Sequence, residues 1–182
     1  MSASGNADLR EEIRRLHHEK DAAYRDAWKK RGEVISILAN IARKIDRLAY
    51  ILDDGPVTAD ESPRDTAIDL MVYSLKYQTY LADLDPVVAK KLFVGSDLSR
   101  PYSDGPRGFE HLLSQVDMSQ VDMAGGDTQR MTLADAVGFV LRRFGELEAC
   151  FAGLTTAAPV HTRLTCAQKL TDAVVCLLAT FR

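Results

Sequence analysis

The apolar residues between positions 34 and 52 recur every three or four positions and place the strongest constraint on the fold. They form one continuous stripe along a helix: Val34, Ile37, Leu38, Ile41, Ile45, Leu48, Ala49 and Leu52. Gly32 before them predicts a break or a tight corner, and Asp53-Asp54-Gly55-Pro56 after them is typical of a helix end. A helix with one long apolar face must bury that face, so this segment predicts a helical core.

Six further segments have helical patterns, and no segment has the convincing alternation of a strand. The predicted helices cover residues 7–30, 63–81, 86–93, 109–116, 132–151 and 162–181. Ser62 and Asp65 have the spacing of a capping box, with Pro63 as the first helical residue. Thr132 and Asp135 repeat that spacing before a later helix. The sequence therefore predicts an all-α helical bundle.

Gly, Pro, Ser and Asp gather between residues 96 and 108, so we place the main boundary in this loop. Residues 1–95 are expected to form one helical region. Residues 109–182 are expected to form a helical extension that packs on it or mediates oligomer formation. The last two predicted helices are apolar over more than one face, which predicts a homo-oligomer, most simply a two-fold dimer. A monomer with one shared core is the alternative.

Composition excludes several classes of protein. The formal net charge is -3, so nucleic acid is an unlikely partner for the chain as a whole. No apolar run approaches the roughly 18 residues of a membrane span, and residues 1–8 are polar, so we expect a cytoplasmic protein without a signal peptide. Cys150, Cys166 and Cys176 are odd in number and lack CxxC spacing, which favours buried free thiols over a disulfide framework or a zinc site.

Two carboxylates one helical turn apart are the first candidates for chemistry. Asp65 and Asp69 share one face of the third helix, where they repel each other unless a cation relieves them. Mg²⁺ is commonly held by one or two carboxylates together with phosphate oxygens. Asp46 on the neighbouring helix is a third candidate ligand, and Glu61 is a candidate general base. The alternatives are ordinary: a capping role for Asp65 and an ion pair with Arg43 for Asp46.

Basic and aromatic side chains beside these acids are candidates for binding a nucleotide. Lys30, Lys44 and Arg47 could contact phosphate groups, although cations on an amphipathic helix are also what a solvated face presents. Three aromatic residues could stack on a base, although aromatic residues at helical spacing more often belong to the core. They are Tyr24, Trp28 and Tyr73.

The same segment also resembles a known family. The residues that carry the resemblance are Tyr24, Trp28-Lys29-Lys30-Arg31-Gly32, Ala42-Arg43-Lys44, Asp46-Arg47-Leu48, Glu61, Arg64-Asp65, Asp69-Leu70 and Tyr73. This pattern looks like the nucleotide-modification-associated domain, a small helical family common in phages and bacteria. The resemblance covers residues 24–80 and implies a role near nucleotide metabolism. It also implies an arrangement similar to the MazG-like all-α nucleotide pyrophosphohydrolases, which bind Mg²⁺ through acids on helices. The chain departs from the MazG pattern, because it has Asp65-xxx-Asp69 where ExxD is expected and no clear ExxE on the second helix.

Three functional hypotheses follow. The first is a Mg²⁺-dependent hydrolase of a nucleotide phosphoanhydride, in which the metal polarises the phosphate and activates a water. The second is a module that binds or senses a nucleotide or another phosphorylated small molecule without turnover. The third is a structural protein whose C-terminal helices form an oligomer.

Overall fold

The computed structural model describes residues 3–54, 62–119, 131–154 and 156–181. Within them lie seven α-helices: α1 (Ala3–Tyr24), α2 (Ala39–Asp54), α3 (Pro63–Leu84), α4 (Pro86–Leu92), α5 (Arg107–Gln115), α7 (Leu133–Glu148) and α8 (Val160–Ala179). Two short helices, a 3₁₀-helix (Arg25–Trp28) and a π-helix (Glu33–Leu38), connect α1 to α2. Strands β1 (Phe151–Ala152) and β2 (Thr156–Ala157) form a small hairpin between α7 and α8. The predicted all-α class is confirmed.

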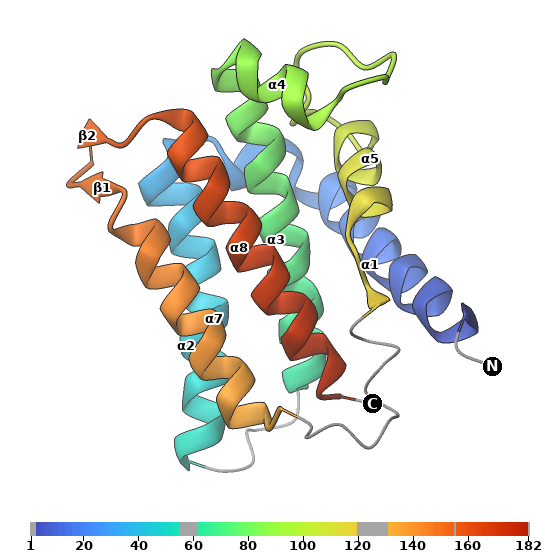
Figure 1. The fold of residues 1–182 in the computed structure, drawn as a ribbon, viewed down its shortest axis with the longest axis vertical. Coiled ribbons are helices and arrows are strands. Elements are labelled where there is room, and N and C mark those ends of the chain that lie inside the picture. The colour runs from blue at the N-terminus through green and yellow to red at the C-terminus, as the bar shows by residue number, and fades with distance from the viewer. Residues whose placement is uncertain (1–2, 55–61, 120–130, 155, 182) are drawn as a thin grey trace.

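Four of the helices form a closed bundle. α2 packs on α3, α3 on α8, α8 on α7 and α7 on α2, so each helix has two neighbours in the ring. α3 and α8 run side by side through the centre of the molecule, with α2 and α7 on one side and α1 and α5 on the other (Figure 1). α4 packs on α3 at one end. The residues before and after the loop at 96–108 therefore share one core.

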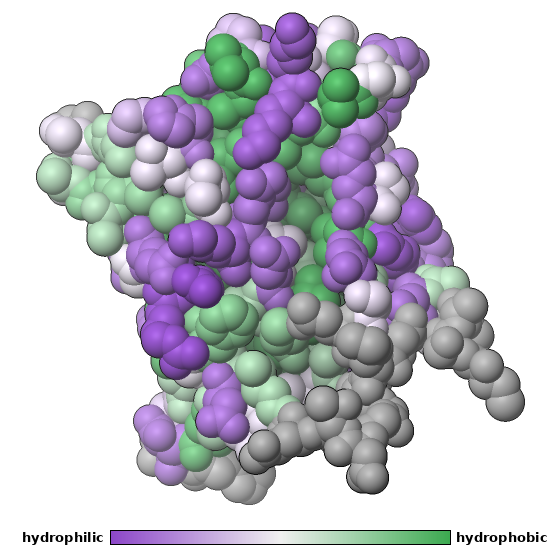
Figure 2. All heavy atoms as spheres, viewed as in Figure 1, coloured by the Kyte–Doolittle hydropathy of each residue, from purple (hydrophilic) through white to green (hydrophobic). Residues whose placement is uncertain are grey.

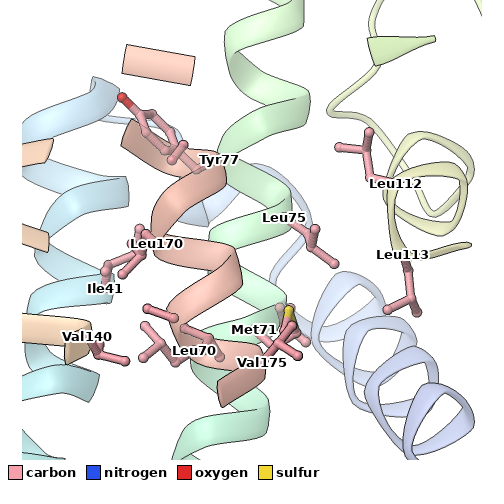
Figure 3. Close-up of a cluster of buried hydrophobic side chains, with 14 of the residues drawn as sticks. Ile41, Leu70, Met71, Leu75, Tyr77, Leu112, Leu113, Val140, Leu170 and Val175 are labelled. Carbon is pink, nitrogen blue, oxygen red and sulfur yellow. The ribbon is translucent and has the colours of Figure 1, made fainter. Parts of the chain in front are cut away.

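The centre of the bundle is filled by one large apolar side chain from each of its helices. Figure 3 shows these residues close together: Ile41, Leu70, Val140 and Leu170. On its other side α3 also faces α1 and α5, through Met71 and Leu75 among others. Because α3 is covered from several directions, nearly every residue from Thr66 to Ala82 is buried. Full burial explains why α3 lacks the one-sided apolar pattern of α2.

Both predicted capping boxes are present. The Ser62 hydroxyl accepts a hydrogen bond from the Asp65 amide at 3.1 Å, and the Asp65 carboxylate accepts one from the Ser62 amide at 3.1 Å. Thr132 and Asp135 make the same pair of bonds at the start of α7. Two of the four unpaired amides at each helix start are satisfied in this way. The first residues of α3 and α7 were thus readable from sequence.

The segment between α1 and α2 differs from the prediction. The first helix was expected to continue to residue 30, but the α-helical part ends at Tyr24. Gly32 is the predicted corner, with a φ of 83° that a residue with a side chain rarely adopts. The next helix opens with π-type hydrogen bonds over Glu33–Leu38 before it becomes α2. π-turns are uncommon and often lie at functional sites, and the apolar period alone does not reveal them.

The hairpin at 151–157 is the second difference. The helix predicted to end at residue 151 ends at Glu148, and Phe151 pairs with Ala157 instead. Strands of two residues are too short to produce an alternating pattern, so neither strand was predicted. The first helix begins at Ala3, four residues before its predicted start at residue 7, and the other helix boundaries lie within three residues of the prediction.

The apolar arcs from which a homo-oligomer was predicted are largely covered inside the chain. Ten residues of α8 are buried, and α8 lies between α3 and α7. Some large apolar side chains remain exposed, among them Ile35, Leu141 and Leu154. Hydrophobic areas lie between the hydrophilic side chains on the face in Figure 2. The oligomer stays a prediction. The apolar residues of α8 from which it was predicted are buried against α3 and α7 of the same chain.

Candidate functional site

Asp69 is the acid on which the predicted site depends, and the structure buries it between three helices. Only 2% of the residue is exposed. Its Oδ1 accepts a hydrogen bond from the Lys20 ammonium of α1. The Lys44 ammonium of α2 lies 2.5 Å from Oδ2. Oδ2 makes no hydrogen bond within the described residues, so its contact with Lys44 is an ion pair without hydrogen-bond alignment. One carboxylate of α3 therefore ties α1 and α2 together.

The two lysines remain partly accessible to solvent. About a quarter of each side chain is exposed, 26% for Lys20 and 23% for Lys44. Each ammonium group carries three N–H donors and no acceptor. Asp69 offsets the repulsion between them, and the three groups together carry a net positive charge. This arrangement suits an anion that approaches from solvent.

A pocket of about 510 Å³ opens beside this cluster. Its walls come from the first three α-helices of the chain: Glu12, Arg15, Leu16, Glu19 and Lys20 of α1, Lys44 of α2, and Asp65, Ile68 and Asp69 of α3. The lining is almost entirely charged, with only two apolar side chains. A pocket of this volume lies within the range of small-molecule sites, and its polarity favours a charged ligand over an apolar one.

Most of the acids in the pocket already have cationic or hydrogen-bonding partners. Glu12 accepts two hydrogen bonds from the Arg64 guanidinium, each at 2.6 Å. Asp65 accepts hydrogen bonds from the Ser62 hydroxyl and amide, and the hydroxyl bond contributes most to the lowered pKa of Asp65. The Glu19 carboxylate lies 3.9 Å from the Arg15 guanidinium. These acids serve first as partners of groups in the chain itself.

Two tyrosines lie near Lys20 and Lys44, the two lysines that contact Asp69. The Lys20 ammonium is 5.5 Å from the centroid of the half-buried Tyr73 ring. Burial raises the pKa of the Tyr73 hydroxyl, and the negative charge of Asp69 adds to that increase. Tyr24 is 66% exposed, and its charge adds a small further increase to the pKa of Tyr73. Tyr73 and Tyr24 are thus placed near the pocket, although neither lines it.

Trp28 belongs to a different environment. It is 5% exposed, its ring meets Tyr80 edge-on, and the Lys76 ammonium lies 4.6 Å from its centroid. Lys76 is itself buried and lies 3.6 Å from an Asp21 carboxylate oxygen. Burial lowers the pKa of Lys76, and the Asp21 charge opposes that shift. The structure therefore places Trp28 in the core, away from the pocket lining.

The other predicted site residues are not brought into the pocket lining. Asp46 and Lys30 are exposed, and Arg47 is half-buried with a contact of its own. Glu61, the predicted general base, lies outside the described residues. Lys44, Asp65 and Asp69 are therefore the predicted site residues that line the pocket.

The arrangement around Asp69 does not fit a magnesium ion. Mg²⁺ requires several oxygen ligands in near-octahedral geometry. In the described part of the chain, no group of three or more His, Cys, Asp or Glu side chains could hold a metal ion. Both oxygens of Asp69 contact ammonium groups, which a metal would have to displace. Magnesium binding stays a prediction from the sequence.

Sequence reasoning missed the contribution of α1. Glu12, Arg15 and Lys20 line the pocket, but the predicted site began at Tyr24. Positions 12, 15, 16, 19 and 20 have the spacing i, i+3, i+4, i+7 and i+8, so they share one helix face. This spacing is a signal that the sequence carried. Nothing in it indicated that this face of α1 would lie opposite Lys44 and Asp69.

A second buried polar cluster lies at the other end of α3. The Tyr77 hydroxyl donates to Glu33 Oε1 at 2.6 Å, and the Arg163 guanidinium donates to the other Glu33 oxygen. Arg163 also donates to the Ala158 carbonyl oxygen at 2.9 Å. Burial and the Glu33 charge raise the pKa of Tyr77, which stays protonated. The cluster joins the start of the π-helix to α3 and α8, and all three partners are satisfied, so we interpret it as structural.

Comparisons of this chain with protein-family models, with curated proteins and with solved structures found no match. A search of the described helices found none with the length and apolar character needed to cross a membrane. We therefore infer the function from the residues and geometry of the site itself.

Proposed function

We propose that the pocket between α1, α2 and α3 binds a phosphorylated small molecule, with nucleotides as the first candidates. The observation that carries this proposal is the pair of ammonium groups, Lys20 and Lys44, gathered on one buried carboxylate at the edge of a charged pocket. Ammonium groups bind phosphate oxygens through charge-assisted hydrogen bonds, which are stronger than neutral ones. The nucleotide preference rests on the family resemblance of residues 24–80.

In this proposal Asp69 positions the lysines and does not contact the ligand. A phosphate group that enters the pocket meets the ammonium groups of Lys20 and Lys44 in its wall. Arg15, in the same wall, is a third cation, with the Glu19 carboxylate 3.9 Å from its guanidinium. The half-buried ring of Tyr73, close to Lys20, offers an aromatic surface on which a base could stack. Binding and sensing need no more than these groups.

Hydrolysis of a nucleotide phosphoanhydride with Mg²⁺ is the second candidate. It is favoured by four carboxylates in the wall of one pocket: Glu12, Glu19, Asp65 and Asp69. It is disfavoured by the partners that these carboxylates already have in the chain. We therefore rank non-catalytic binding above turnover, and assign no catalytic step to these residues.

One screen separates the candidates. Thermal unfolding is followed with nucleoside mono-, di- and triphosphates and with pyrophosphate, each with and without Mg²⁺, and released phosphate is assayed in the same wells. Stabilisation that needs no Mg²⁺ and gives no product supports the binding module. Stabilisation with Mg²⁺-dependent product supports the hydrolase. No stabilisation by any of these compounds argues against both and favours the structural hypothesis.

Lys20→Met and Lys44→Met are the informative variants, because methionine keeps the length of the chain and removes the charge. Lys91→Met is the matched control, since Lys91 is an exposed lysine of α4 away from the pocket. Loss of stabilisation in the first two variants but not in the third assigns binding to this pocket.

A further inference from the structure

Cys150 and Cys166 are brought into contact by the turn between α7 and α8. Their sulfur atoms lie 3.7 Å apart although the residues are 16 positions apart in the chain. Cys150 follows the last turn of α7, and Cys166 lies in the second turn of α8. The sequence predicted buried thiols, but both residues are only half-buried in the structure. Half-burial leaves a path for a small reagent from solvent.

Backbone contacts hold the two thiols in this position. The Ala158 amide donates to the Cys150 carbonyl oxygen at 2.7 Å and closes the hairpin of β1 and β2. Arg163 donates to the Ala158 carbonyl oxygen at 2.9 Å, which ties the hairpin to the first turn of α8. α7 and α8 also pack along their length. Because the two sulfur atoms already lie 3.7 Å apart, only a small movement is needed to bring them to the disulfide bond length of about 2.05 Å.

We propose that Cys150 and Cys166 are a redox-active dithiol that forms an intramolecular disulfide when the protein meets a low-molecular-weight disulfide. This inference is independent of the proposed function of the pocket. Neither cysteine lines that pocket, and both lie on the last two helices of the chain.

The reaction proceeds by two exchange steps. One protein thiol loses its proton, and the thiolate attacks a sulfur of the small disulfide. A mixed disulfide forms and one small thiolate leaves. The second protein thiol then loses its proton and attacks the protein sulfur of the mixed disulfide, which expels the second small thiolate. The protein dithiol loses two electrons, and the small disulfide is reduced to two thiols, which take up the two protons.

The environment of Cys150 sets the rate of this exchange. Burial, with a smaller contribution from the hydrogen bond to Cys166, raises the pKa of the Cys150 thiol to about 11. The thiolate is the attacking species, so exchange through Cys150 is slow at neutral pH and accelerates as the pH rises. The Cys150 thiol therefore reacts only slowly with a small disulfide at neutral pH.

Cys176 provides an internal control. It lies on the same helix as Cys166, ten residues further along, or about 15 Å at 1.5 Å per residue. Disulfide bonds need Cα atoms within about 7 Å, so Cys166 and Cys176 cannot pair while α8 is folded.

The sequence allows each cysteine to be followed separately. Trypsin cleavage after Arg143, Arg163 and Lys169 places Cys150, Cys166 and Cys176 on three different peptides. The folded full-length chain is incubated with oxidised glutathione at neutral and at alkaline pH. Free thiols are then blocked, and the digest is analysed by mass spectrometry with and without reduction.

The expected product is the chain lighter by two hydrogen atoms, with the peptides 144–163 and 164–169 linked and Cys176 blocked as a free thiol. Cys150→Ser and Cys166→Ser are expected to abolish the linked peptide, and Cys176→Ser to retain it. Three free thiols, glutathione adducts without the link, or a link that involves Cys176 would each overturn the proposal. The linked peptide is read from the unmutated chain, so a variant that fails to fold does not prevent the test.

Discussion

The Lys44 ammonium of α2 lies 2.5 Å from the Asp69 carboxylate of α3, and Lys20 of α1 bonds to the other oxygen of the same group. The sequence places these three residues on three separate helices. Their meeting makes Asp69 a structural centre as well as a component of the candidate site. The stability of the junction and the binding of anions should therefore both depend on Asp69.

Asp69→Asn should destabilise the fold. If Asp65 and Asp69 repelled each other in an empty metal site, removal of one charge would stabilise the fold. In this structure the Asp69 carboxylate instead offsets the charges of two ammonium groups. Because both lysines are partly exposed and can reach water, we expect a loss of about 1–3 kcal/mol, below that of a fully buried pair. Urea denaturation measures the change, with Asp46→Asn, at an exposed position of α2, as the control. Equal stability of Asp69→Asn and the unmutated chain would contradict the account.

His17 should make the fold sensitive to acid. It is 1% exposed, stacks on Phe109 at 3.8 Å, and burial lowers its pKa from 6.5 to about 3. The folded chain therefore binds fewer protons than the unfolded chain between these pH values, so stability falls as the pH falls through that window. From pH 7 to pH 5 the His17 contribution is about 2 kcal/mol by linkage.

The His17→Phe variant isolates this contribution. It should lose about 2 kcal/mol less stability between pH 7 and pH 5 than the unmutated chain, as measured by denaturation at each pH. His161→Gln, an exposed histidine on α8, is the control and should follow the unmutated chain. A pH dependence that His17→Phe leaves unchanged would show that His17 is not buried as a neutral group.

The capping box of α3 gives a third prediction. Ser62→Ala removes the hydroxyl that bonds to the Asp65 amide and carboxylate. N-cap losses of this kind cost about 1 kcal/mol. Thermal or chemical unfolding measures the effect, with Ser99→Ala in the exposed loop as the control. If Ser62→Ala unfolds like Ser99→Ala, the Asp65 carboxylate is free for another role and its capping assignment is wrong.

The Glu33 cluster gives a fourth prediction. Arg163→Met leaves Glu33 buried without its cation, and the two side chains are only 8% and 13% exposed. Breaking one partner of a buried pair costs about 3–5 kcal/mol, whereas Tyr77→Phe removes a single hydrogen bond worth about 1–3 kcal/mol. Double-mutant cycles with Glu33→Gln separate the two contacts. Additive losses in the Glu33/Arg163 cycle would show that the pair does not couple.

The helices were predictable because their signals are local. The stripe on α2 and the capping residues Ser62 and Thr132 depend on spacings within a few residues. The π-turn at Glu33 and the hairpin at Phe151 were missed because tertiary contacts fix them: Glu33 bonds to Tyr77 and Arg163, and the hairpin connects α7 to α8.

The candidate site was predictable only in part. Asp69 stands out in sequence as an acid one helical turn from Asp65, and Lys44 as a cation on the neighbouring helix. The identity of the cation could not be read, because Lys20 lies 49 residues from Asp69 in the chain. In the structure two lysines contact the Asp69 carboxylate, and the Mg²⁺ site stays a prediction.

Phosphate binding by the pocket can be measured by titration calorimetry of the folded chain with a nucleoside triphosphate and with pyrophosphate, without Mg²⁺. We expect saturable binding by the unmutated chain and by Lys91→Met. Binding should be weaker by roughly tenfold or more in Lys20→Met and Lys44→Met, because each loses a charge-assisted hydrogen bond to phosphate. Equal affinity of all four proteins, or no binding of either compound, would contradict the assignment of this pocket to a phosphorylated ligand.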